Sequence, residues 1–188
     1  IIERHGIMYV NILQMGGFPE AVAGLSRGVI DGAVFSPPHN FRMLKEGFRE
    51  LVSQKELRDF GSGFLTQGIV ARRSFAAAHR DVVVRLIKTT VEATQYALTH
   101  EEYSKRVISK YLRINDAELL RQSYLYMVDT FVREPFVPES TMQAMLQRMV
   151  QMNMIDAKSA QSTPTSAYFD NSFVMELKKN GFLDNIWK

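Results

Sequence analysis

The sequence predicts an α/β fold in which a glycine-rich, strand-bearing half is followed by a helical half. Residues 1–75 contain most of the glycines and the β-prone segments, whereas residues 77–188 show apolar side chains at helical spacing. Residues 10–38 in particular have the pattern strand, glycine turn, helix and second strand. At 188 residues and 46% hydrophobic content, the chain can bury one good core or two small lobes.

The first half of the chain begins with a short apolar run that two glycines interrupt. Gly16 and Gly17 end the run, and Pro19 suits the first turn of a helix that we expect to reach Ser26. The segment after Gly28 is again apolar and β-prone, and a pair of prolines stops it. We therefore expect strands at residues 10–15, 29–36, 48–53 and 64–72.

The second half reads almost wholly as helix. Residues 81–98 place Val84, Ile87, Val91 and Leu98 on one face, and a further helix is expected at 101–112. Asn115 or Asp116 caps a third helix, Ser140 or Thr141 opens a fourth, and Asp170 or Asn171 caps a last one that ends at Gly181. Polar residues 157–167 are predicted to be a loop. Five methionines between 142 and 154 fit an adaptable binding face or, as we favour, an ordinary buried stripe.

Composition excludes several function classes. The net charge is +3 and no run of basic residues interleaved with aromatics occurs, so nucleic-acid binding is not expected. The absence of cysteine excludes disulfides, thiolate metal sites and cysteine catalysis. The four histidines are isolated, and neither a nucleophile elbow, a phosphate loop nor a dinucleotide turn occurs. We therefore predict no catalytic residues, no metal, no cofactor and no segment inserted in a membrane.

The turn at residues 16–19 and the strand end at 36–38 are the best candidates for a ligand site. Ligands of open α/β sheets lie beyond the carboxyl ends of strands, where a helix N-terminus also favours anions. A glycine turn before a helix is common in any α/β protein, however, and does not by itself name a function. His39 directly follows the expected strand end, but capping of a turn is an alternative role for it.

Four segments in order carry a family resemblance. The segment ILQMGGFPEAVAGLSRGVIDGAVFSPPHNF resembles the second-lobe core of NMT1/THI5-like proteins, the nitrate, sulfonate, taurine and bicarbonate group of substrate-binding proteins of ABC importers. Residues 66–97 resemble the family's strand, turn and helix, with Arg80 where proline is common, and residues 101–116 and 168–187 resemble its closing helices. Gly32 stands where the family usually has alanine.

The resemblance implies a type II periplasmic-binding-protein-like fold, with a three-layer αβα lobe plus C-terminal helices. By this analogy residues 1–65 form the second, ligand-binding lobe, residues 66–73 the hinge strand, and residues 74–188 the helical remainder of the first lobe and a C-terminal extension. The start at IIERHG, without Met, is interpreted as that of a partial chain. For such a chain we expect weak ligand binding and an exposed apolar surface on residues 77–188 unless another chain covers it.

The implied function is capture rather than chemistry: two lobes close on a small anionic or polar organic molecule and deliver it to a permease. The ligand would be held by residues of the two turns and of the hinge. These are Gly16, Gly17, Phe18, Ser36, Pro38, His39, Asn40 and Gln67. The protein would be periplasmic, or extracellular and membrane-anchored, with its signal segment outside the given sequence.

Two alternatives stay open at this stage. The related pyrimidine-forming enzymes of thiamine synthesis use a histidine and pyridoxal phosphate, but they also have a cysteine-rich iron site, which this chain lacks. A regulatory ligand-sensing domain with the same lobes is the second alternative. The ligand itself is not identified by the sequence.

Overall fold

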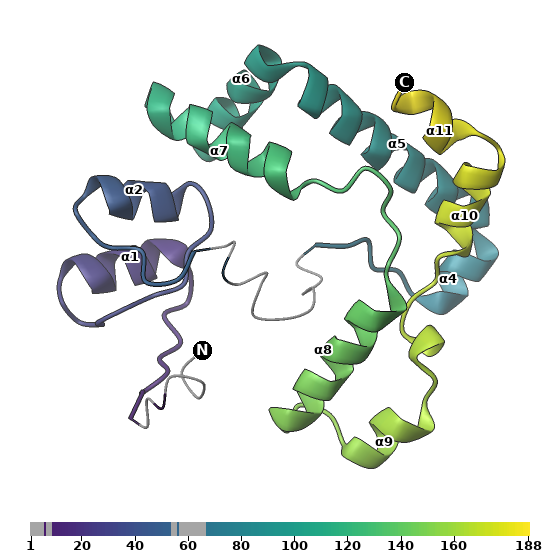
Figure 1. Ribbon diagram of the computed structural model, residues 1–188, viewed down its shortest axis with the longest axis horizontal. Coiled ribbons are helices and arrows are strands. Elements are labelled where there is room, and N and C mark those ends of the chain that lie inside the picture. The colour runs from purple at the N-terminus through teal and green to yellow at the C-terminus, as the bar shows by residue number, and fades with distance from the viewer. Residues whose placement is uncertain (1–5, 7–8, 54–55, 57–66) are drawn as a thin grey trace. The chain divides into compact units, whose positions relative to one another are not determined.

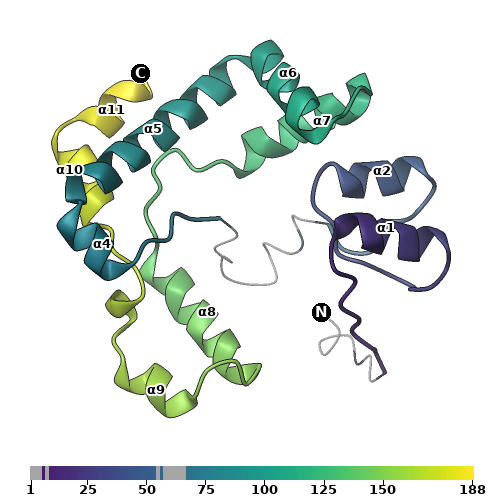
Figure 2. The ribbon, with the colours of Figure 1, turned by 180° about the vertical axis from the view of Figure 1, so that it is seen from behind.

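The computed structural model describes residues 6, 9–53, 56 and 67–188. Over these residues the fold is helical, and no strand is present. The predicted α/β class with a three-layer αβα lobe is therefore wrong for the described part of the chain. Helices and connections are seen in Figure 1, and from behind in Figure 2.

The chain divides into two compact units, which we describe separately. The first comprises residues 1–60 and 101–130, and the second comprises residues 61–100 and 131–188. The predicted division at residues 65 and 73 stays a prediction, and part of it falls on residues 57–66, outside the described residues.

The first unit is built from four described helices. They are α1 (Phe18–Ser26), α2 (His39–Lys45), α6 (Glu101–Leu112) and α7 (Ala117–Thr130). Helix α1 contacts α2, α2 contacts α7, and α6 packs against α7. Met43 and Tyr124 are buried in this unit, and burial raises the pKa of the Tyr124 hydroxyl. An ion pair from Lys45 to Asp116 ties α2 to the residue that caps α7.

The segments predicted as strands in this unit run beside α1 without pairing. Residues 10–15 and 29–36 have no ladder, and apolar side chains such as Ile12 (84% exposed) face solvent. Extended backbone is stable in a sheet only when a neighbouring strand accepts its hydrogen bonds and covers one face. Neither condition is met by the described residues, and the same holds for residues 48–53 and 67–72. Residues 64–66 of the fourth predicted strand lie outside the described residues.

The second unit is also helical and contains the best-buried core of the chain. Its helices are α4 (Arg73–Ala78), α5 (Arg80–Thr99), α8 (Glu139–Gln151), α9 (Ala157–Ser162), the 3₁₀ turn η2 (Thr165–Ala167), α10 (Ser172–Lys179) and α11 (Phe182–Ile186). Helix α10 lies along α5, and α11 folds back onto the same side (Figures 1 and 2). The core residues are Val83, Ile87, Val91, Phe173, Val174, Leu177 and Leu183.

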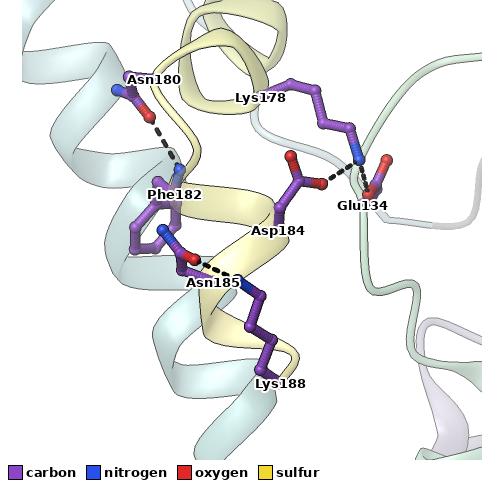
Figure 3. Close-up of polar contacts among 7 residues, drawn as sticks. All are labelled: Glu134, Lys178, Asn180, Phe182, Asp184, Asn185 and Lys188. Carbon is purple, nitrogen blue, oxygen red and sulfur yellow. Dashed lines mark hydrogen bonds and ion pairs between the residues drawn. The ribbon is translucent and has the colours of Figure 1, made fainter.

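Polar contacts fix the chain around this core. Lys178 donates to both Glu134 and Asp184, with each nitrogen–oxygen distance 2.6 Å, and thereby joins the connection before α8 to α10 and α11 (Figure 3). The two carboxylates, that of Asp184 first, raise the pKa of the Lys178 ammonium. Asn171 makes a two-way contact with the main chain of Val137: its carbonyl accepts from Val137 N–H and its amide donates to Val137 C=O, both at 2.9 Å.

Most helices agree with the sequence prediction, and four differ. Helix α4 lies at residues 73–78, where no helix was expected. The pair Pro37–Pro38 does not only end the preceding segment, because Pro38 also occupies the cap position of α2. The predicted loop at 157–167 contains α9, which Asp156 caps by accepting from Ser159 N–H at 2.8 Å. Gly181, with φ +79, ends α10 as predicted, but α11 then follows it.

Exposed apolar side chains occur in residues 77–188, as expected. They include Val132, Met152 and Met154, whereas most of the methionines of α8 itself are half-buried. The methionine cluster therefore behaves mainly as the packing stripe of a helix. None of the described helices is sufficiently long and apolar to cross a membrane.

Candidate functional site

The candidate site lies in the first unit, where the turns that precede α1 and α2 meet. Gly16 turns the chain with φ +88, and Gly17 then occupies the cap position of α1 in extended conformation. Gly17 C=O accepts the first helical hydrogen bond, from Ala21 N–H at 3.0 Å. No side chain caps this helix end. The N–H groups at the start of α1 are thus left without a side-chain acceptor in the described part of the chain.

Gly17 lies close to the side chain of Glu20. A β-carbon built there would lie 2.8 Å from the Glu20 carboxylate oxygen Oε2, closer than atoms approach without rearrangement. Glu20 is at the third helical position, and its carboxylate oxygen Oε2 lies close to Gly17. A negative group therefore already lies near the positive end of α1.

The second turn begins α2 and brings His39 to Phe18. His39 N–H donates to Ser36 C=O at 3.0 Å, across the cis peptide bond of Pro37–Pro38. The His39 ring centroid lies 5.2 Å from that of Phe18, and the Phe35 centroid lies 6.2 Å from Phe18, both with tilted rings. Three aromatic rings thus join the two turns at distances typical of attractive ring pairs.

Asn40 adds a polar atom to this group. Its side-chain oxygen Oδ1 is buried, and it has no hydrogen-bond partner within the described residues. A buried carbonyl oxygen without a partner costs free energy, and most such atoms in proteins have a donor. This oxygen is therefore the atom of the site that most needs a hydrogen-bond donor.

The structure brings together most, but not all, of the predicted site residues. Those in the two turns lie in one unit: Gly16, Gly17, Phe18, Ser36, Pro38, His39 and Asn40. Gln67 is exposed and belongs to the second unit. Its predicted role in the hinge stays a prediction.

Sequence reasoning missed two members of the site. Phe35 lies in the expected strand 29–36 and Glu20 in the expected first helix, and neither was predicted to be a site residue. An aromatic residue two positions before a proline pair, and a glutamate three positions after a capping glycine, are the signals that indicate them. Of the described residues, no group of three or more histidine, aspartate or glutamate side chains is placed to hold a metal ion.

Comparison with known protein families identifies the family of this chain. Residues 4–112, which include both turns, match the NMT1-like family. The chain belongs to the NMT1-like family. No curated protein and no solved structure matches the chain.

Membership of the NMT1-like family confirms the resemblance found in the sequence. The family indicates a substrate-binding function and a small-molecule ligand, and it consists mostly of binding proteins. The site described above lies wholly within the matched residues.

Proposed function

We propose that this protein is the solute-binding component of an ABC importer and that the two turns of the first unit form one wall of its ligand site. The observation that carries the proposal is the approach of Phe18 to His39 at 5.2 Å, within the residues that match the NMT1-like family. Two turns that are far apart in sequence present an exposed helix start and a ring cluster at the same place. The ligand is delivered to a membrane permease in the periplasm or at the cell surface.

The chemistry of this wall favours a small, flat, polar organic molecule over a simple inorganic anion. Aromatic rings offer faces and edges to a planar group. Asn40 Oδ1 and the Glu20 carboxylate are both acceptors, so they match donor groups of a ligand. A free anion at the start of α1 would instead meet the Glu20 carboxylate, which already lies near that helix end.

A ligand titration with paired variants tests this proposal. Isothermal titration calorimetry of the protein with nitrate, taurine and a set of aromatic carboxylates and amides first finds the ligand. His39→Ala should then weaken binding by about tenfold, the order of magnitude of one ring contact with its hydrogen bond. The matched control is His79→Ala, because His79 also contacts a phenylalanine, Phe75, at 4.8 Å but lies in the second unit.

A glycine pair provides the second comparison. Gly17→Val places a side chain against the Glu20 carboxylate, which must turn away, and should weaken binding, whereas Gly32→Val, where nothing lies within 4 Å, should leave it unchanged. Equal affinities for the Gly17 and Gly32 variants would contradict the proposed wall. Binding that is intact in both His39→Ala and Gly17→Val would place the ligand elsewhere.

A further inference from the structure

Helix α6 carries an exposed stripe of basic and apolar side chains that the ligand site does not use. Its members are spaced by three and four, so they lie on one helical face: Tyr103, Arg106, Val107, Lys110 and Tyr111. All five are exposed, Tyr111 at 73%. Ser104, on the flank of this stripe, is buried, and α6 packs against α7. The sequence has no contiguous basic–aromatic run here, but the helical spacing assembles one.

The two cations of the α6 stripe have no carboxylate partner within the described part of the chain. Arg106 lies over the ring of Tyr103 and Lys110 over that of Tyr111, each at 5.6 Å. The acidic residues nearby are occupied by other cations. Glu101 and Glu102 pair with Lys105, Asp116 with Lys45, and Glu118 with Arg121. The positive charge of the stripe is therefore available to an external anion.

A shallow groove beside the stripe is suited to the anion itself. It has a volume of about 420 Å³ and runs between α6 and α7. Its lining on α6 is formed by Glu102, Lys105, Arg106, Ser109 and Lys110, and Ala117 and Leu120 form the side on α7. Glu102 is paired with Lys105, so Arg106, Lys110 and the Ser109 hydroxyl are left to meet an anion. Cations and a hydroxyl around a small open groove match a phosphate group.

We propose that the α6 stripe docks this protein on an anionic lipid surface. Its apolar side chains lie at the boundary between headgroups and acyl chains, and its cations contact the headgroup phosphates. Interfacial helices combine basic residues with aromatic and aliphatic ones in this way, and tyrosine favours the membrane–water interface. The helix lies on the surface and does not cross it, consistent with the absence of a spanning helix in the described residues.

Size and composition favour lipid over a macromolecular partner. A helix of 12 residues is about 18 Å long and 10 Å wide, so the face covers roughly 180 Å². Stable protein interfaces need about 800 Å² per partner. Single-stranded nucleic acid uses cations and stacking rings, but it gives no reason for exposed Val107 between them.

Vesicle sedimentation tests the proposal. The protein should bind vesicles of phosphatidylcholine mixed with phosphatidylglycerol, bind pure phosphatidylcholine weakly, and lose affinity as salt is added. Each basic residue near an anionic surface contributes about fivefold in affinity, so Arg106→Glu with Lys110→Glu should weaken binding more than tenfold. Val107→Ser with Tyr111→Ser should weaken it less. Far-ultraviolet circular dichroism verifies that each variant keeps its helix content.

The matched control is Lys158→Glu with Lys179→Glu, which changes the net charge equally but lies on α9 and α10. It should retain vesicle binding within about twofold, since charge outside the contact is screened within a Debye length. Equal loss in this control, or no sedimentation of the wild-type protein with phosphatidylglycerol vesicles, would overturn the proposal. Release of the protein from vesicles by inorganic phosphate alone would also overturn the proposal. So would tighter binding to single-stranded DNA or to polyglutamate than to vesicles.

Discussion

Apolar residues are buried in the core around α5, α10 and α11, but many are exposed in the segment that contains α1. In the first region Leu183 and Leu177 are almost fully buried, at 0% and 2% exposure, and the apolar residues packed around them belong to the same unit. In the second, Val10, Ile12 and Val34 are exposed although they lie in segments with the pattern of buried strands. The contrast shows that an apolar residue is stabilising only where the rest of the fold provides a surface to cover it.

The largest expected effect tests this contrast directly. Leu177→Ala should lower the free energy of unfolding by about 2–5 kcal/mol, because it leaves a cavity among helices that cannot close around it. Urea unfolding followed by circular dichroism measures the change. Ile12→Ala is the control and should stay within about 0.5 kcal/mol, as exposed positions do. A similar cost at both positions would mean that residues 9–15 are buried in solution.

A smaller effect should come from the polar contact between Asn171 and Val137. Asn171→Ala removes the donor and the acceptor that serve the partly buried main chain of Val137, and should cost about 1–3 kcal/mol. Asn185→Ala is the matched control, because its side chain accepts from exposed Lys188 and serves no buried main-chain group among the described residues. If both variants unfold at the same urea concentration, the 131–138 connection is not held by Asn171, and the second unit is less ordered than the core alone suggests.

The smallest expected effect compares two aspartates at helix starts, one in each unit: Asp116, which caps α7, and Asp170, which directly precedes the cap residue of α10. The pKa of Asp116 is lowered, first by the hydrogen bond from Lys45 and then by Leu119 N–H, and the pKa of Asp170 is lowered by Ser172. A carboxylate whose folded pKa is lowered stabilises the fold fully above its unfolded pKa, about 3.9, and this stability is lost as pH falls through the folded pKa. Asp116→Asn and Asp170→Asn should therefore each reduce the loss of stability on acidification.

Added salt distinguishes the contributions of Asp116 and Asp170. Urea midpoints measured from about pH 6 down to about pH 3 should show that added salt weakens the acid-sensitive contribution of Asp116 more than that of Asp170, because only the first depends mainly on an exposed cation. Equal salt sensitivity would show that the Lys45 ion pair contributes little to α7.

The sequence predicts helices well where a helix buries a stripe of apolar side chains at helical spacing. Residues 81–98 correspond to α5 (Arg80–Thr99), and Phe173, Val174 and Leu177 are buried as expected from the spacing in α10. Local signals suffice here, because apolar periodicity and a capping aspartate act within a few residues.

Local signals could not show that the expected strands are absent from the described residues. Residues 29–36 have β propensity, but a strand also requires a partner at a distant point of the sequence, and no local residue specifies one. The helices α2 and α9 were missed for the reverse reason. A proline pair and a polar Ala–Ser segment are typical of loops, yet Pro38 and Asp156 occupy cap positions.

The candidate site was predictable as two turns but not as a set of contacts. Glycines and prolines indicated where the chain reverses, and the structure places Phe18 against His39 accordingly. The approach of Phe35 and the unpartnered oxygen of Asn40 depend on how α1 and α2 pack, which spacing along the chain does not encode.

The contact of Asn171 with Val137 also has a chemical consequence over the lifetime of the protein. Asn171 is followed by Ser172, and hydrolysis of its side-chain amide would exchange an –NH₂ group for a carboxylate oxygen. The atom that now donates to Val137 C=O would become an acceptor facing an acceptor. Ageing at this one amide would therefore release the proline-containing connection from the start of α10, without any change in the apolar core.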